Sequence, residues 1–269
     1  MSRCKICESP AREHARKRIL GKYEGIYLRC DACGFVWVDA PHWLEEAYSR
    51  AITALDTGIV TRNLWLRDVA LALLGTQLRD VRHILDHGGG TGLFVRLLRD
   101  AGHDAWWWDA HCDNLLARGY EAESGATFDM VTAFEVVEHF VEPMPELLAL
   151  RERAPRLLIS TELQPSDPAA LMGWHYLAPE AGQHIGFFTR RSLEMVAERL
   201  SLKLSSNGRN LHLLAPERIS DRWLHLLRKP SWASKWAWLG RGRSLAHPDA
   251  AEQLTRLQEQ DNHRENTAG

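Results

Sequence analysis

From residue 82 onward, short apolar runs alternate with longer amphipathic segments. The apolar runs have the length of buried strands, and several end at an acidic residue. We predict strands at 83–87, 104–110, 128–135 and 156–162, and two more near 202–206 and 209–214. A further strand near 117–122 is only weakly marked by the sequence. Together these runs predict a sheet of seven strands.

Segments with a helical spacing of apolar residues separate the predicted strands. They lie at 93–102, 143–154 and 189–202, with Gly102 closing the first and Thr189 placed to cap the last. Strands separated by helices indicate βαβ units and a mostly parallel sheet. The predicted fold class is therefore α/β, a doubly wound, Rossmann-like sheet with helices on both faces.

The chain before and after this α/β unit has other patterns. We predict a small cysteine-bearing unit over 1–40, a helical connector over 41–80 and the α/β domain over 81–216. Residues 217–269 form a helical tail rich in Trp and Arg, and its polar end is expected to be disordered.

Composition is that of an ordinary globular protein, with 269 residues, 45% hydrophobic and 25% charged. The net charge of −2 and the sequence pI of about 6.7 give no global basic field for nucleic acid. The polar start MSRCKICESPAREHARKR does not read as a signal peptide, and no long apolar run predicts a membrane span. We therefore expect a cytoplasmic location.

Four of the five cysteines form two Cys-x-x-Cys pairs, Cys4 with Cys7 and Cys30 with Cys33, separated by 22 residues. This spacing is typical of a four-thiolate structural zinc ribbon, in which each pair supplies two sulfur ligands from one tight turn. A unit of this size has too little core to fold alone, so the metal would supply much of its stability.

The segment HILDHGGGTGLF joins a predicted strand to a helix through a glycine-rich turn. Glycines there let the backbone approach a bound nucleotide closely. The residues Asp86, Gly88, Gly90 and Gly92 resemble the first motif of class I S-adenosylmethionine-dependent methyltransferases. The resemblance covers residues 60 to 215 and implies that these four residues contact S-adenosylmethionine.

Asp109 ends the next strand, 17 residues after Gly92, and the resemblance implies that its carboxylate binds the ribose hydroxyls. The sequence departs from the family pattern in two places. Gly89 stands where the family usually has Cys, and the weak strand near 117–122 leaves the residue beside the adenine unassigned.

FEVVEHF, residues 134–140, places Glu135, Glu138 and His139 at the end of another predicted strand. In open α/β sheets this edge holds the ligand, and Glu135 is expected to contact the cofactor. Three interpretations compete. In the first, the residues form an exposed loop with incidental polar side chains. In the second, His139 is the general base with Glu138 as its partner. In the third, Glu135, Glu138, His139 and His184 hold a divalent cation. The last two rest on resemblance to sugar methyltransferases and to metal-dependent O-methyltransferases, respectively.

Residues 172–189, MGWHYLAPEAGQHIGFFT, are crowded with aromatic and polar side chains. We expect this segment to cover the methyl acceptor, with contacts from Trp174, Tyr176, Gln183 and His184; the alternative is a hydrophobic lid without direct contact. The segment resembles a signature of bacterial glycan-pathway methyltransferases.

In the tail, tryptophans are interleaved with Arg and Lys. Such a composition can mark peripheral membrane contact, and the alternative is a pair of helices packed on the catalytic domain.

These observations predict an S-adenosylmethionine-dependent O-methyltransferase that acts on a small hydroxylated acceptor, such as a sugar or glycan precursor. A C-methyltransferase acting on a nucleotide-linked sugar, an RNA methyltransferase and a non-catalytic scaffold protein are the alternatives. The weakly acidic pI argues against a nucleic-acid partner.

Overall fold

The structure is a computed structural model that describes residues 2–49, 52, 54 and 56–268, with side chains as far as residue 259. It contains a central six-stranded sheet with the order β10-β11-β8-β7-β5-β6. The strands are β5 His83–His87, β6 Asp104–Trp108, β7 Met130–Phe134, β8 Leu157–Ser160, β10 Lys203–Ser206 and β11 Leu211–Ala215. All neighbouring pairs from β8 to β6 are parallel, and β11 runs antiparallel to both of its neighbours.

Helices cover both faces of this sheet, as predicted. They are α2 Ile59–Leu74, α3 Leu93–Asp100, α4 Pro143–Arg153 and α5 Arg190–Arg199. Successive strand residues enter different cores: Ile84 packs in the cluster that contains α2 and α3, and Leu85 packs in the cluster that contains α4 and α5. Because strand side chains alternate between faces, apolar runs that are buried on both faces are the signature of such a sheet.

The prediction of a seventh strand near 117–122 is wrong. In the part of the chain that the structure describes, the segment near 117–122 contributes only a single parallel bridge, Trp107 with Glu121. Gly119 adopts a positive φ of +87° there, which interrupts an extended backbone. The sheet is therefore mixed and six-stranded.

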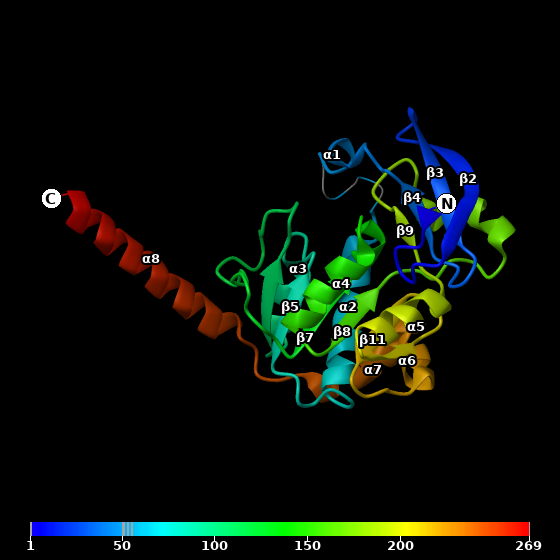
Figure 1. Ribbon diagram of the computed structural model, residues 1–269. Coiled ribbons are helices and arrows are strands. Elements are labelled where there is room, and N and C mark those ends of the chain that lie inside the picture. Colours follow the sequence, from blue (N-terminus) through cyan, green and yellow to red (C-terminus); the bar gives the residue numbers. More distant parts are fainter. Residues whose placement is uncertain (1, 50–51, 53, 55, 269) are drawn as a thin grey trace.

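The N-terminal residues form a second sheet with the order β1-β2-β3-β4-β9, and all its strands are antiparallel. Four strands come from the start of the chain: β1 Ser2–Arg3, β2 Pro10–Ile19, β3 Tyr23–Cys30 and β4 Val36–Asp39. The fifth, β9 Gly186–Phe187, belongs to the segment between β8 and α5. Figure 1 shows β9 beside β4, so the cysteine-bearing unit and the α/β domain share this sheet.

After β11 the chain forms α6 Asp221–Leu227 and α7 Pro230–Ala237, which pack against α2. The last helix, α8 Ala246–Ala268, extends away from the body of the molecule (Figure 1). In the part of the chain that the structure describes, every helix is too short or too polar to cross a membrane. The predicted domain boundaries and the predicted disorder at the end of the chain stay predictions.

The first turn of α8 is fixed by a buried ion pair. The Arg99 guanidinium donates to both Asp249 oxygens at 2.9 and 2.8 Å, and each side chain is 7% exposed. Arg99 also contacts Asp104, at 2.9 Å, and lies over the Tyr120 ring. These contacts hold α8 against the edge of the sheet at β6.

We expect Asp249→Ala to lower the free energy of unfolding by about 3 kcal/mol, because the buried Arg99 guanidinium loses its bidentate partner and keeps only Asp104 as a counter-charge. Chemical denaturation measures the change. Glu198→Ala, which removes an exposed pair with Arg191 on α5, is the control and should change stability by about 0.5 kcal/mol or less. Equal losses in the two variants would contradict the role assigned to the buried pair.

Candidate active site

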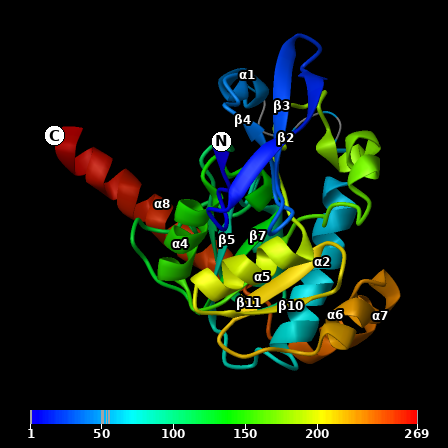
Figure 2. The same ribbon diagram turned by 45° about the vertical axis from the view of Figure 1, so that its right-hand side comes forward.

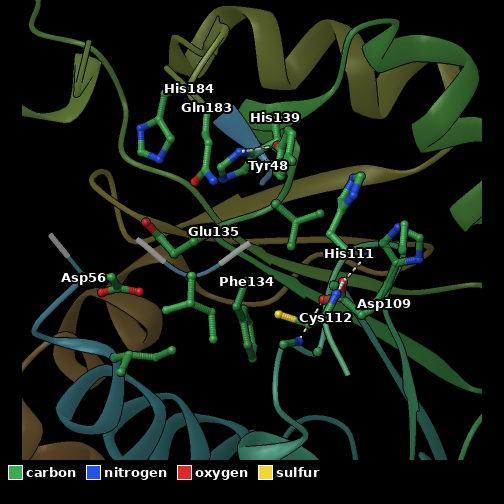
Figure 3. A pocket seen from close by; sticks show the side chains of 18 of the residues that line it. Tyr48, Asp56, Asp109, His111, Cys112, Phe134, Glu135, His139, Gln183 and His184 are labelled. Carbon is green, nitrogen blue, oxygen red and sulfur yellow. Dashed lines mark hydrogen bonds between the residues drawn. The ribbon is translucent and has the colours of Figure 1, made fainter. Parts of the chain in front are cut away.

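A cavity of about 1080 Å³ opens at the carboxyl ends of β5, β6 and β7 (Figure 3). This is the edge where open α/β sheets bind their ligands. The glycine turn and the end of β6 form one wall, and the start of α2 with the segment before it forms another. The remaining wall combines FEVVEHF with residues 175–184.

The three predicted glycines of the turn have different roles. All adopt positive φ, +70° at Gly88, +54° at Gly90 and +84° at Gly92. A Cβ at Gly88 would lie 2.5 Å from Val136 Cγ2, and one at Gly92 would lie 2.6 Å from Asn114 Oδ1. At Gly90 nothing lies within 4 Å. The outer glycines therefore allow close packing, and the middle one leaves the backbone open to a ligand.

Two side chains of the β6 region fix the glycine turn. Gly90 N donates to Asp109 Oδ2 at 2.8 Å, and Trp107 Nε1 donates to Gly90 O at 2.9 Å. The other Asp109 oxygen accepts from the backbone N–H groups of His111 and Cys112. Asp109 thus stands on the cavity wall, as its sequence position predicts. The contribution of Trp107 is not apparent from the sequence, where it is one of three consecutive tryptophans.

Asp86, at the end of β5, is 3% exposed and accepts a hydrogen bond of 2.7 Å from Thr132 Oγ1. Burial raises the pKa of Asp86 to about 7, and the nearby Asp109 charge acts in the same direction. The hydrogen bond from Thr132 opposes this shift. The carboxyl group of Asp86 can therefore change its charge near neutral pH.

The chain leaves strand β7 at Glu135, a residue with a strained backbone. Glu135 has a φ of +56°, and a 3-10 turn, η1 Val137–His139, follows it. Glu135 Oε1 accepts from Ser160 Oγ at 2.7 Å, and Glu135 N donates to the same hydroxyl at 3.0 Å. A non-glycine residue with positive φ is uncommon and clusters at functional sites. None of the seven residues is exposed, and Val137, Glu138 and Phe140 are buried, so the interpretation as an exposed loop is wrong.

Tyr176 bridges the two carboxylates of the motif. Its hydroxyl lies 2.6 Å from Glu138 Oε1 and 3.0 Å from Glu135 Oε2. A phenol has one proton to donate, so satisfying both contacts requires a second proton on a carboxyl group. Glu138 is fully buried, and this burial, followed by the Glu135 charge, raises its pKa well above the ordinary value. Its second oxygen, Oε2, has no hydrogen-bond partner among the described residues.

Glu138, His139 and His184 come together, although 44 residues separate the last two in sequence. One ligand atom from each lies within 4.8 Å of the others, and the two imidazole rings are perpendicular with centroids 4.9 Å apart. Glu135, the fourth predicted member, is not part of this group and reaches Glu138 through Tyr176.

Both imidazoles are held in the neutral form. Burial lowers the pKa of His139 to about 3, helped by His184, and burial also lowers the pKa of His184. His184 Nδ1 donates to Tyr176 O at 2.6 Å, because a carbonyl can only accept. The Nε2 atom of His184 therefore carries a lone pair.

His139 is positioned by Tyr48, a residue of the connector. The Tyr48 hydroxyl lies 2.8 Å from His139 Nδ1, and the Tyr48 ring stacks on His111 with centroids 4.3 Å apart (Figure 3). Sequence analysis did not identify Tyr48, and nothing near it in the sequence signals this contact across 91 positions. Arg62 and Asp56, paired at 2.6 Å on the same wall, were also missed.

The residues expected to contact the acceptor divide into two groups. Tyr176, Gln183 and His184 line the cavity. Gln183 also donates to Ala47 O at 2.9 Å, which ties this segment to the connector. Trp174 is not among the described lining residues; it packs behind Tyr176 with ring centroids 5.1 Å apart.

The four cysteines of the N-terminal unit converge as predicted. The sulfurs of Cys4 and Cys33 are 3.5 Å apart, as are those of Cys7 and Cys30, and all four lie within 4.8 Å of one another. Zn–S bonds of about 2.3 Å in a tetrahedron separate sulfurs by about 3.8 Å, so the cluster fits a zinc ion. None of the four forms a disulfide bond in the part of the chain that the structure describes.

Comparison with known proteins gives one family. Residues 61–207 match the family described as a methyltransferase domain, which includes the glycine turn, Asp109, FEVVEHF and His184. Comparison with the sequences of curated proteins gives no match. The family match leaves out the four cysteines and the tail.

Three solved structures have a similar fold at low sequence identity. TnmH is 19% identical, covering 65% of this chain and 61% of that chain (TM-score 0.44). Magnesium protoporphyrin IX methyltransferase from Synechocystis PCC 6803 is 17% identical, covering 64% and 91% (TM-score 0.45). An O-methyltransferase family 2 protein from Planctomyces limnophilus DSM 3776 is 14% identical, covering 66% and 62% (TM-score 0.45). The chain thus spans less than two thirds of the length of TnmH and of the Planctomyces limnophilus protein.

The pKa of Asp86 predicts a pH-dependent stability. The folded value of about 7 exceeds the unfolded value of about 3.9, so only the folded state keeps the proton between them. The Asp86 contribution to stability should therefore fall as pH rises through this window. Urea denaturation measures the unfolding free energies of wild type and Asp86→Asn. As pH rises, wild type should lose stability relative to the variant. A difference that is constant with pH would contradict this assignment.

Proposed function

The chain belongs to the family of S-adenosylmethionine-dependent methyltransferases, and on that premise we propose that it methylates a hydroxyl group of a small acceptor, such as a sugar or glycan precursor. The observation that supports the proposal is the single cavity that joins the glycine turn to the neutral imidazoles of His139 and His184. Cofactor and acceptor can therefore meet in one space, which distinguishes an enzyme from a scaffold protein.

We assign the cofactor to the wall formed by the glycine turn. There the open backbone at Gly90 can approach the cofactor, and the Asp109 carboxylate can accept from ribose hydroxyls. The described lining residues include one guanidinium, Arg62, and seven carboxyl groups, Glu45, Asp56, Asp86, Asp109, Glu135, Glu146 and Glu162. An excess of carboxyl groups favours a sulfonium cation. The same excess disfavours a phosphorylated acceptor, and thus a nucleotide-linked sugar or RNA.

In one candidate mechanism His139 is the general base. The cofactor, held at the glycine turn and Asp109, would supply the methyl group from its sulfonium, and the His139 imidazole would accept the proton that the acceptor hydroxyl loses. The hydrogen bond with Tyr48 would orient His139 for this transfer. Burial, which lowers the pKa of His139 to about 3, keeps the imidazole unprotonated but opposes the imidazolium that the transfer would form.

A second candidate role for the same residues is to hold a divalent cation. Glu138, His139 and His184 supply three ligand atoms, and the buried Glu138 Oε2 that lacks a partner among the described residues is a further reason to place a cation there. Such an ion would lower the pKa of a bound acceptor hydroxyl. Tyr176 would then keep Glu135 outside the ligand set and fix the orientation of Glu138.

We further propose that the four cysteines hold a structural zinc ion. Four thiolates close the coordination shell, so this ion would have no open position for a substrate. Its role would be to fix the turn after β1, which carries Cys4 and Cys7, to the end of β3 and the turn that follows it, which carry Cys30 and Cys33.

We expect calorimetry to show that wild type binds S-adenosylmethionine and that Asp109→Asn weakens this binding about 10- to 100-fold, because hydrogen bonds from ribose to a charged carboxylate are lost. Asp113→Asn is the matched control: Asp113 is exposed nearby and does not line the cavity, so its affinity should equal that of wild type. Absence of binding to the wild-type protein would contradict the cofactor assignment.

Metal analysis of the purified protein separates the two mechanisms. If the cation interpretation is right, each chain holds zinc and a second divalent ion, and Glu138→Gln and His184→Ala lose only the second. His175→Ala is the control, because His175 lines the cavity but lies outside the three-residue group. One zinc per chain, with methyl transfer lost in His139→Ala, would instead support the general-base mechanism.

A further inference from the structure

The helices that follow the α/β domain have two different faces. On the inner face, Leu224, Leu227, Ala233 and Ala237 are buried in the core that contains α2. This confirms that the tail packs on the catalytic domain, which was one of the two interpretations of its sequence. Figure 2 shows α6 and α7 on the outer side of α2, away from the N-terminal sheet. Their other face is open to solvent.

The segment that runs from α6 to the start of α8 is strongly basic. Residues 222–248 contain six Arg and Lys residues and no Asp or Glu, although the whole chain has a net charge of −2. All six are exposed: Arg222, Arg228, Lys229, Lys235, Arg241 and Arg243. None of the six forms an ion pair with an acid in the part of the chain that the structure describes. This charge is therefore free to act on a partner.

Large apolar side chains stand among these cations. Trp238 is 67% exposed, and Trp232 and Leu226 are each 37% exposed. The ammonium of Lys235 lies 5.3 Å from the centroid of the Trp232 ring, which places a cation and an indole on the same side of α7. Tryptophan and lysine side by side suit the boundary between lipid headgroups and acyl chains.

We propose that this basic tryptophan surface, made by the six cations with Leu226, Trp232 and Trp238, binds the surface of an anionic phospholipid bilayer. Each cation near such a surface is attracted by its negative potential, and the indoles supply apolar contact that does not depend on charge. A second copy of the chain is a poor occupant, because a two-fold interface would bring like charges together. A nucleic acid would satisfy the cations but leaves no role for the exposed Leu226.

The Trp238 end of this surface and the cavity lie at opposite ends of α2, whereas α6 lies nearer the cavity, where Trp65 Nε1 donates to Leu227 O at 3.0 Å. The cavity contacts Ile59 and Arg62 near the start of the helix. At its far end, a Cβ at Gly75 would collide with the backbone that joins Leu239 to Gly240, next to Trp238. A helix of 16 residues separates these ends by about 24 Å. A bilayer that contacts Trp238 would therefore lie at the end of α2 away from the cavity.

Sedimentation of the full-length protein with vesicles tests the proposal. We expect binding to vesicles of phosphatidylcholine mixed with phosphatidylglycerol, little binding to phosphatidylcholine alone, and weaker binding as salt is added. The variant Arg228→Ala/Lys229→Ala/Lys235→Ala should lower the partition coefficient about fivefold per cation removed, or about 100-fold in total. Trp232→Ala/Trp238→Ala should weaken the binding that persists at high salt.

The control removes three exposed cations from the opposite end of the molecule, as Arg12→Ala/Arg18→Ala/Lys22→Ala. It makes the same change in net charge and should bind vesicles as wild type does. The proposal is overturned if wild type does not sediment, if both triple variants lose binding equally, or if a single-stranded oligonucleotide binds and vesicles do not. Calorimetric binding of S-adenosylmethionine, unchanged in all variants, shows that they remain folded.

Discussion

The short pairing between β4 and the segment around β9 is the constraint on which the active site depends. Val38 N donates to Ile185 O at 2.8 Å, and Ile185 N donates to Glu138 O at 2.9 Å. A strand of the cysteine-bearing unit is thereby connected, through one residue, to the backbone of FEVVEHF. His184, directly before Ile185, is brought beside Glu138 and His139 by this connection. The N-terminal unit is thus a structural part of the active site.

The rest of the N-terminal unit reinforces this connection. Thr189 Oγ1, at the cap of α5, donates to Cys33 O at 2.6 Å, and Lys5 Nζ donates to Val141 O at 2.6 Å. Phe35 and Trp37 share a core with Val137 and Phe140 on the far side of the motif. If zinc fixes the four cysteines, it therefore also fixes one wall of the cavity. This structural role accounts for the N-terminal unit without a nucleic-acid partner.

The sequence predicted the parts of the molecule that are local in the chain. Adjacent residues such as Ile84 and Leu85 enter opposite cores, so an unbroken apolar run correctly predicted a strand with helices on both faces. The glycine turn and Asp109 are close in sequence and meet at Gly90 as their spacing suggests. The prediction failed near Gly119, where a single bridge replaces a strand, because the segment has neither apolar alternation nor an extended backbone.

The acceptor side of the site shows why the rest could not be predicted. Its side chains come from the connector, from FEVVEHF and from the segment before β9, and they meet only through tertiary contacts. Tyr48 reaches His139 across 91 positions and Tyr176 reaches Glu138 across 38, and no periodicity or motif encodes either distance. Because a hydrogen bond to a buried group is costly to leave unmade, each of these contacts restricts the others. The proposed cofactor side is therefore defined by one continuous stretch of chain, whereas the proposed acceptor side depends on how the N-terminal unit packs against FEVVEHF and the segment before β9.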